Sequence, residues 1–193
     1  MELNEKIKDL QELGMRNKIR QWEPFMRKHG CNIIAEVGVS KGRNFLSMIE
    51  HEPKVAIAVD SWVEDGTPSR NDRGYTQQVL DEQYAYMKKL SEERPFIKVY
   101  REYSFNVVKG FSDDYFDFVY IDADHTYNGC LKDINDWYPK VKKGGVLVGD
   151  DYIERTVPWT GVEFGVINAV NTFIKDNDLT VFELPRYGWG ILK

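Results

Sequence analysis

Carboxylates follow two predicted strands at the point where each strand ends. Asp122 comes directly after the apolar run 116–121, and Asp150 and Asp151 come directly after the run 144–149. If the two strands are neighbours in a parallel sheet, the three side chains converge at one edge of it. Crowded carboxylates raise one another's pKa, and a divalent cation relieves the repulsion. All-oxygen ligands suit Mg²⁺, Mn²⁺ or Ca²⁺, so we predict a metal site at these three residues.

The same acids have an alternative interpretation as helix caps or solvated loop ends. Asp124, for example, could cap a helix that begins near Tyr127. Only the positions of the side chains distinguish a metal site from a set of caps.

A glycine-containing turn offers a second kind of chemistry. Glu36 ends a short apolar run, and Gly38 and Gly42 follow it ahead of a helical pattern. Glycine lets the backbone approach a ligand closely and adopt a positive φ, and the next helix begins with unpaired N–H groups. The pattern is not the NAD fingerprint, which needs glycine at Ser40 and Arg43. We predict a nucleotide-binding turn at Glu36, Gly38 and Gly42, with an ordinary βα turn as the alternative.

A further acid strengthens the nucleotide interpretation. The buried run 55–59 ends at Asp60, where a carboxylate can accept hydrogen bonds from both ribose hydroxyls of a nucleoside. An ordinary loop acid is the alternative. Ser61 and Trp62 follow directly, and an indole there could stack on adenine or only hold the loop down. We predict that Asp60, Ser61 and Trp62 contact the cofactor.

Strands and helices alternate from residue 32 onward, which predicts a parallel sheet covered on both faces. Only Pro185 and Arg186 join the last two strands, so these form an antiparallel hairpin. The predicted fold is α/β: a Rossmann-like, doubly wound, mostly parallel seven-stranded sheet with a C-terminal antiparallel hairpin. We expect strands near 32–37, 54–59, 96–101, 116–121, 144–149, 179–184 and 187–192. We expect helices near 42–51, 75–90, 104–110, 127–137 and 162–175.

Length and composition predict a single domain. The 193 residues suffice for one sizeable core, with an N-terminal helical segment over 1–30 and the Rossmann-like core over 31–193. Long loops at 61–74 and 152–161 follow carboxyl ends of strands, where they would act as lids or substrate walls. The amphipathic N-terminal segment could pack on its own sheet or on a second copy in a homo-oligomer.

Charge and hydropathy exclude several classes of partner. The net charge of −5 argues against a broad face for nucleic acid. No apolar run approaches the roughly 20 residues of a membrane span, and no signal peptide is visible at the N-terminus, so a cytoplasmic location is expected. Cys31 and Cys130 form neither a disulfide framework nor a metal knuckle.

The spacing of the motifs resembles a known family. The stretches Asp-x-Asp-His-x-Tyr at 122–127 and Gly-Asp-Asp-Tyr at 149–152, with Asp133 and the glycine pair 144–145, are similar to class I S-adenosylmethionine (SAM)-dependent methyltransferases. The resemblance is to the small-molecule O-methyltransferase group that contains macrolide-sugar O-methyltransferases and cephalosporin hydroxylase, and more distantly to catechol O-methyltransferases. It covers roughly residues 33–173 and implies SAM as cofactor and a small-molecule acceptor.

The resemblance also implies roles for individual residues. One metal ligand follows the fourth strand in that group and two follow the fifth, at the positions of Asp122, Asp150 and Asp151, although many relatives have His-Asp at the last two. The catechol enzymes place a lysine base three residues after the first ligand, where this chain has His125. An imidazole titrates near neutral pH and can accept the proton of a hydroxyl.

Two further cofactor contacts follow from the resemblance alone. Asn44 falls where relatives contact the SAM carboxylate, and Ser104 falls near their adenine region. The predicted reaction is metal-assisted O-methylation of a small molecule such as a sugar, in which the metal orients the hydroxyl and lowers its pKa. The alternatives are a metal-independent N-methyltransferase and a catalytically inactive SAM-binding domain. Oxidative chemistry ranks last because no facial triad is visible.

Overall fold

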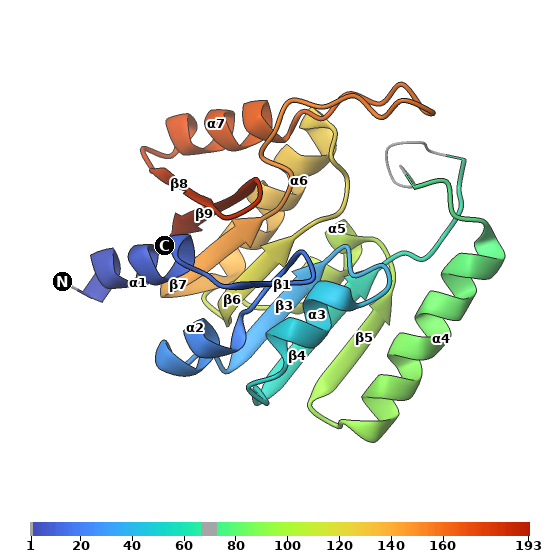
Figure 1. The fold of residues 1–193 in the computed structure, drawn as a ribbon, viewed down its shortest axis with the longest axis horizontal. Helices are drawn as coiled ribbons and strands as arrows, with labels where there is room; N and C mark the ends of the chain where they lie inside the picture. Colours follow the sequence, from blue (N-terminus) through green and yellow to red (C-terminus); the bar gives the residue numbers. More distant parts are fainter. Residues whose placement is uncertain (1, 67–72) are drawn as a thin grey trace.

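Runs rich in Val and Ile form the parallel strands of a central sheet. The computed structural model describes residues 2–66 and 73–193 (Figure 1). The parallel strands are β3 (Ile33–Val37), β4 (Val55–Asp60), β5 (Ile97–Arg101), β6 (Phe116–Ile121) and β7 (Val141–Gly149). The C-terminal hairpin consists of β8 (Val181–Leu184) and β9 (Gly188–Leu192).

The sheet reverses its order at β3. The strands lie in the order β5-β4-β3-β6-β7-β9-β8, with β9 antiparallel to both β7 and β8. The chain therefore moves outward in one direction from β3 to β5 and in the other from β6 to β9. Ligands bind at such switch points because neighbouring connections leave the sheet toward opposite faces. The predicted seven-stranded sheet and its antiparallel hairpin are confirmed.

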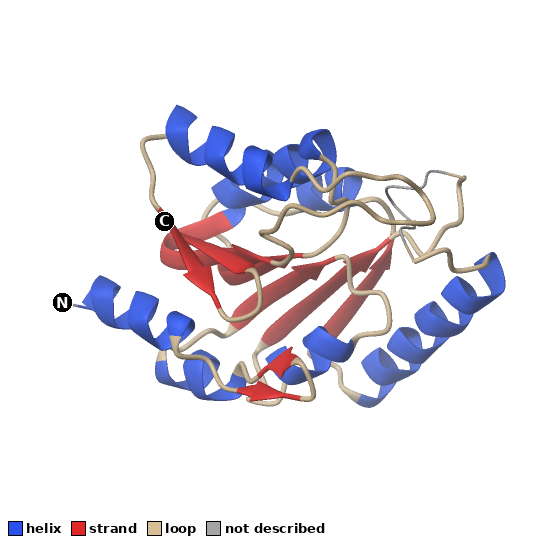
Figure 2. Cartoon of the chain, turned by 45° about the horizontal axis from the view of Figure 1, so that its top comes forward, coloured by secondary structure: helices blue, strands red, loops and turns tan. Residues whose placement is uncertain are grey.

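Helices cover both faces of the sheet (Figure 2). One face packs against α1 (Glu2–Gln11), α2 (Glu23–Lys28), α3 (Arg43–Met48) and α4 (Gln77–Glu93). The other packs against α5 (Ser104–Val107), its 3₁₀ continuation η1 (Val108–Gly110), α6 (Tyr127–Trp137) and α7 (Val166–Asp176). A 3₁₀ turn, η2 (Tyr138–Lys140), connects α6 to β7. No helix in either described range is long and apolar enough to cross a bilayer.

The N-terminal segment, expected to be helical over 1–30, also contains strands. Between α1 and α2 the chain forms a small antiparallel hairpin of β1 (Met15–Arg16) and β2 (Ile19–Arg20). Its two central residues, Asn17 and Lys18, both have positive φ, which is the backbone of the tight turn that suits the twist of two-residue hairpins. This hairpin brings Arg20 under the carboxyl end of the sheet.

The last predicted helix begins later than expected. The structure has α7 from Val166 instead of 162, because the residues before it pair with the preceding loop. Thr156 and Glu163 form an antiparallel bridge, and Phe164 N–H donates to the Arg155 carbonyl at 2.7 Å. We call residues 155–164 the ribbon. It projects from the carboxyl-end side of the sheet in Figures 1 and 2.

Candidate active site

A pocket of about 240 Å³ opens at the carboxyl ends of the central strands. Its wall is built from residues that follow β3, β4, β5 and β6, with side chains of α4 and α6 at the sides. This position is the switch point of the sheet, as the glycine turn predicts. The predicted residues on the pocket wall are Gly38, Asp60, Ser61, Ser104, Asp122 and His125.

Gly38 lies where the residues that follow β3 meet the residues that follow β6. Its φ is 89°, and a Cβ at this position would overlap the backbone carbonyl of Asp122. The ends of β3 and β6 approach this closely because Asp122 N–H donates to the Val37 carbonyl at 2.8 Å. On the other side, Gly38 N–H donates to the carbonyl of Val59 in β4, also at 2.8 Å. Only glycine fits at this point, which fixes the distance between the turn and the Asp122 backbone.

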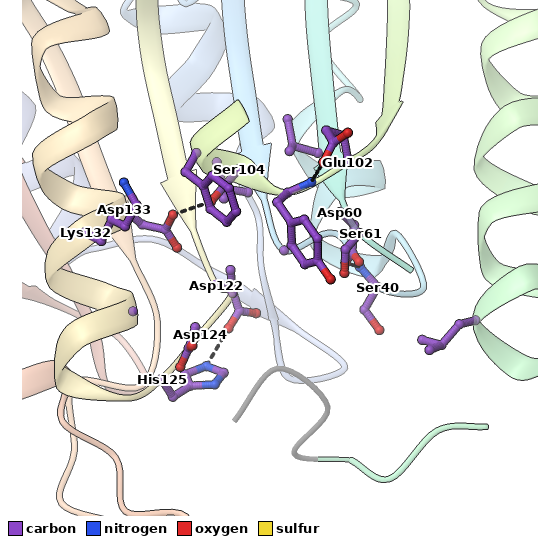
Figure 3. A pocket seen from close by; sticks show the side chains of 18 of the residues that line it. Ser40, Asp60, Ser61, Glu102, Ser104, Asp122, Asp124, His125, Lys132 and Asp133 are labelled. Atoms are coloured by element: carbon purple, nitrogen blue, oxygen red, sulfur yellow. Dashed lines mark hydrogen bonds and ion pairs between the residues drawn. The ribbon is translucent and has the colours of Figure 1, made fainter. Parts of the chain in front are cut away.

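Asp60 is held in place by backbone donors. Its carboxylate accepts from Ser40 N–H at 2.8 Å through one oxygen and from Trp62 N–H at 2.8 Å through the other. Burial raises the pKa of Asp60, and the two hydrogen bonds oppose that effect. Each oxygen keeps a lone pair for a further donor. The carboxylate is therefore suited to accept from a pair of vicinal hydroxyls (Figure 3).

The wall that follows β5 contains residues that we did not single out from the sequence. Tyr103 and Phe105 stack on each other with ring centroids 5.4 Å apart and line the pocket. Between them, Ser104 donates its hydroxyl to Asp133 of α6 at 2.5 Å. The only available signal was the position of these aromatic residues directly after a predicted strand.

Asp133 makes the stability of the protein depend on pH. Burial raises the pKa of its carboxyl to about 7, against the opposing hydrogen bond from Ser104. Between about pH 4 and pH 7 the folded state therefore binds one more proton than the unfolded state, and the free energy of unfolding falls as pH rises. Asp133→Asn removes this charge, so its stability relative to the wild type should be about 2 kcal/mol more favourable at pH 8 than at pH 5. Urea unfolding of the variant and the wild type at pH 5 and at pH 8 measures these free energies. If the variant and the wild type differed by the same amount at both pH values, the prediction would be contradicted.

Three groups that can bind a metal meet at one side of the pocket. The Nε2 atom of His125 lies 3.1 Å from Asp122 Oδ1 and 3.1 Å from Asp151 Oδ2. One donor atom from each residue can be chosen so that all lie within 4.8 Å of one another. Figure 3 shows the contact between Asp122 and His125 at the end of the β6 strand. We call Asp122, His125 and Asp151 the acid–histidine cluster.

The histidine offsets part of the negative charge of the acid–histidine cluster. Burial by itself would lower the pKa of His125, but the hydrogen bonds with Asp122 and Asp151 outweigh it and raise the pKa to about 10. Burial raises the pKa of Asp122, whereas that of Asp151 is lowered because its contact with His125 outweighs the effect of burial. In this arrangement one nitrogen of the His125 ring contacts both carboxylates, and their negative charge favours the protonated form of the ring.

The ribbon covers the outer side of His125. The Phe164 ring stacks on the imidazole with centroids 4.5 Å apart, and Gly165 N–H donates to the His125 carbonyl at 2.8 Å. Asp151 has a φ of 56°, a left-handed conformation that turns the chain sharply after β7. These contacts fix the positions of both residues relative to Asp122.

The structure places Asp150 outside the acid–histidine cluster. Its carboxylate accepts from the guanidinium of Arg20 at 3.1 Å. Arg20 is only 4% exposed and also donates to Tyr120 OH at 2.8 Å, to the Pro185 carbonyl at 2.9 Å and to the Arg186 carbonyl at 3.1 Å. Asp150 thus binds a cation from the N-terminal hairpin, and its predicted role as a metal ligand stays a prediction.

Four other predicted cofactor residues lie behind the pocket wall. Asn44 accepts from the Trp22 indole at 2.7 Å and donates to Glu36 at 3.3 Å, and burial raises the pKa of Glu36 well above its usual value. Trp62 is fully buried and donates its indole N–H to the Ser40 carbonyl at 3.1 Å. Gly42, with a φ of 73°, precedes α3. These residues stabilise the glycine turn and do not themselves line the pocket.

Comparison with known families identifies the chain. A family model described as a methyltransferase domain matches residues 35–152. The chain belongs to this family. The matched segment runs from β3 to the residues after β7 and contains Gly38, Asp60 and the whole acid–histidine cluster. The predicted class of enzyme, a class I SAM-dependent methyltransferase, is confirmed by this match.

Solved structures share the fold of this methyltransferase at low sequence identity. An O-methyltransferase from Bacillus cereus in complex with SAH is 13% identical, with a TM-score of 0.62, over 100% of this chain and 90% of that chain. The O-methyltransferase NovP is 14% identical, with a TM-score of 0.61, over 99% and 78%. Spermidine synthase from Thermotoga maritima is 16% identical, with a TM-score of 0.51, over 83% and 52%. No curated protein sequence matches the chain.

Proposed function

We propose that this methyltransferase transfers the methyl group of SAM to a hydroxyl oxygen of a small molecule with the assistance of a divalent metal. The observation that carries the proposal is the position of Asp122. Its side chain lines the same pocket as Asp60 and also contacts His125 of the acid–histidine cluster. A nucleoside held by Asp60 and a metal held by Asp122 would therefore lie side by side. The solved O-methyltransferases with this fold support the choice of oxygen as the acceptor atom.

The nucleoside half of the pocket is suited to SAM. The Asp60 carboxylate would accept from the two ribose hydroxyls, since both its oxygens are already oriented by backbone donors. The absence of a side chain at Gly38 leaves room for the ligand where β3 and β6 meet. Tyr103 and Phe105 offer apolar ring surface for the base.

The acid–histidine cluster fits a divalent cation. Octahedral Mg²⁺ and Mn²⁺ sites with bonds of about 2.1 Å have neighbouring donor atoms about 3 Å apart, close to the 3.1 Å contacts of His125 Nε2. Two carboxylate oxygens and one imidazole nitrogen suit Mn²⁺ as well as Mg²⁺. When bound, the metal would act as a Lewis acid toward the acceptor hydroxyl. Asp122, His125 and Asp151 are the ligands that we propose.

This ligand set changes the role of His125 from the one predicted from the sequence. An imidazolium bound by two carboxylates cannot accept a proton from a substrate. A metal ion would compete with that proton for the same Nε2 atom, because only the deprotonated imidazole binds a metal. We therefore propose that His125 is a ligand and that its role as general base is the alternative.

Cofactor binding provides the direct test of the donor half of the site. Asp60→Ala should weaken the binding of SAH by about 10-fold to 100-fold, because two charge-assisted hydrogen bonds to the ribose are lost. Isothermal titration calorimetry measures the dissociation constants. Glu64→Ala, an exposed acid four residues further along the chain, is the matched control and should bind SAH as the wild type does. Failure of the wild type to bind SAH would contradict the cofactor assignment.

A metal-independent N-methyltransferase is the second candidate. The contact of His125 with both carboxylates supports it, because a protonated imidazole offsets part of their negative charge without a metal. Methyl transfer that survives full chelation would favour this candidate. SAH binding without turnover on any acceptor would favour a catalytically inactive SAM-binding domain.

A further inference from the structure

Two arginines from different loops lie near the site, one on the pocket wall and one beside the acid–histidine cluster. Arg73 lines the pocket and belongs to the loop between β4 and α4. Arg155 belongs to the ribbon, and its guanidinium lies over the Phe164 ring at 5.3 Å. The same ring stacks on His125, so the guanidinium of Arg155 lies just outside the acid–histidine cluster. Both arginines are close enough to Asp151 to lower the pKa of its carboxyl.

Neither guanidinium forms an ion pair with a carboxylate in the described part of the chain. Within residues 2–66 and 73–193, no ion pair shorter than 4.0 Å involves Arg73 or Arg155, and both residues are exposed. By contrast, Arg20 binds Asp150 and Arg101 binds Asp81. The two side chains therefore keep their hydrogen-bond donors available to a ligand that enters the mouth of the pocket.

The charge around the acid–histidine cluster favours an anionic ligand. Asp122 and Asp151 are matched by the proposed divalent cation, and no carboxylate in the described ranges forms an ion pair with either guanidinium. An acceptor with a carboxylate would supply that charge, and a planar carboxylate matches the donor fork of an arginine. A neutral acceptor would leave both arginines solvated and would gain nothing from them.

We infer that the methyl acceptor is a hydroxylated carboxylic acid whose carboxylate is bound by Arg155 and Arg73 while its hydroxyl faces the acid–histidine cluster. This inference rests on the proposed function. The two arginines that would select the acceptor lie in loops. The part of the pocket proposed to bind SAM is built from residues at strand ends. No bond is made or broken at the arginines, which only bind and orient the acid.

Matched probes with and without a carboxylate test the inference. The methyltransferase, saturated with SAH and Mg²⁺, is titrated calorimetrically with 3,4-dihydroxybenzoate and with catechol, and with galacturonate and galactose. The acidic member of at least one pair should bind about tenfold or more tightly than its neutral partner, as expected for charge-assisted hydrogen bonds. Arg155→Gln and Arg73→Gln should each remove most of that preference and leave the SAH affinity within about twofold.

A control variant and several distinct outcomes decide between this inference and its failure. Arg16→Gln changes an exposed arginine of the N-terminal hairpin and should preserve the preference for acids. Equal affinity for acidic and neutral probes, no binding of either, or equal weakening of both by the arginine variants would overturn the inference. A loss of SAH binding in Arg73→Gln would assign that arginine to the cofactor and overturn its role here. Failure of the wild type to bind SAH would instead overturn the proposed function.

Discussion

Asp151→Asn should weaken Mn²⁺ binding by about 100-fold, whereas Asp150→Asn should leave it within about threefold of the wild type. The two acids are adjacent in the sequence, but only Asp151 contacts His125, and Asp150 is bound by Arg20. Substitution of residues that merely support metal ligands costs about 10-fold to 100-fold in affinity, so loss of a ligand should reach the upper end. Metal-dependent methyl transfer should be abolished in Asp151→Asn alone.

Electron paramagnetic resonance of free Mn²⁺ during a titration in the presence of SAH measures these affinities directly. His125→Asn serves as a third variant, because a ligand role predicts weaker Mn²⁺ binding and a base role predicts slower turnover at unchanged affinity. Equal losses in Asp150→Asn and Asp151→Asn would restore the three-carboxylate site that the sequence predicts. Unchanged affinity in Asp151→Asn would refute the proposed ligand set.

Arg20→Met should lower the free energy of unfolding by about 3 kcal/mol, the effect expected when one partner of a buried ion pair is removed. Its guanidinium binds Asp150, the Tyr120 hydroxyl and two carbonyls of the β8–β9 turn. Methionine fills a similar volume but leaves those acceptors without their donor. Urea unfolding followed by circular dichroism measures the loss.

Arg16→Met is the matched control for this experiment. Arg16 lies in the same small hairpin and is exposed, so its substitution should change the stability by less than about 0.5 kcal/mol. The double variant Arg20→Met/Asp150→Asn should recover part of the lost stability, because it removes the carboxylate that has lost its partner. An additive loss in the double variant would contradict the buried ion pair as the cause.

The sheet and the nucleotide half of the pocket could be predicted because each rests on a local pattern. The run 55–59 ends at Asp60, and the run 116–121 ends at Asp122, and the order of the elements brings both acids to the same edge. Gly38 could be predicted for the same reason, since a turn after a strand needs a residue that adopts a positive φ. These positions depend on neighbours that lie close along the chain.

The contact that separates Asp150 from the acid–histidine cluster could not be predicted, because it depends on a long-range partner. Nothing in residues 144–151 distinguishes Asp150 from Asp151, and the difference arises from Arg20, which is 130 residues away from Asp150. The hairpin that carries Arg20 has only two residues in each strand, too few for a visible alternating pattern. The bridge between Thr156 and Glu163 could not be predicted either, because the helical pattern that begins at residue 162 includes Glu163.

The close backbone contact at Gly38 fixes the geometry of one part of this enzyme, whereas the residues that we assign to acceptor binding lie elsewhere and can vary. The carbonyl of Asp122 occupies the space that any side chain at residue 38 would need, so the spacing between the glycine turn and the Asp122 backbone is set by the main chain. The arginines that we assign to acceptor choice are carried on exposed loops. Exchange of those loops should therefore redirect the enzyme to new acceptors without altering the alignment needed for transfer.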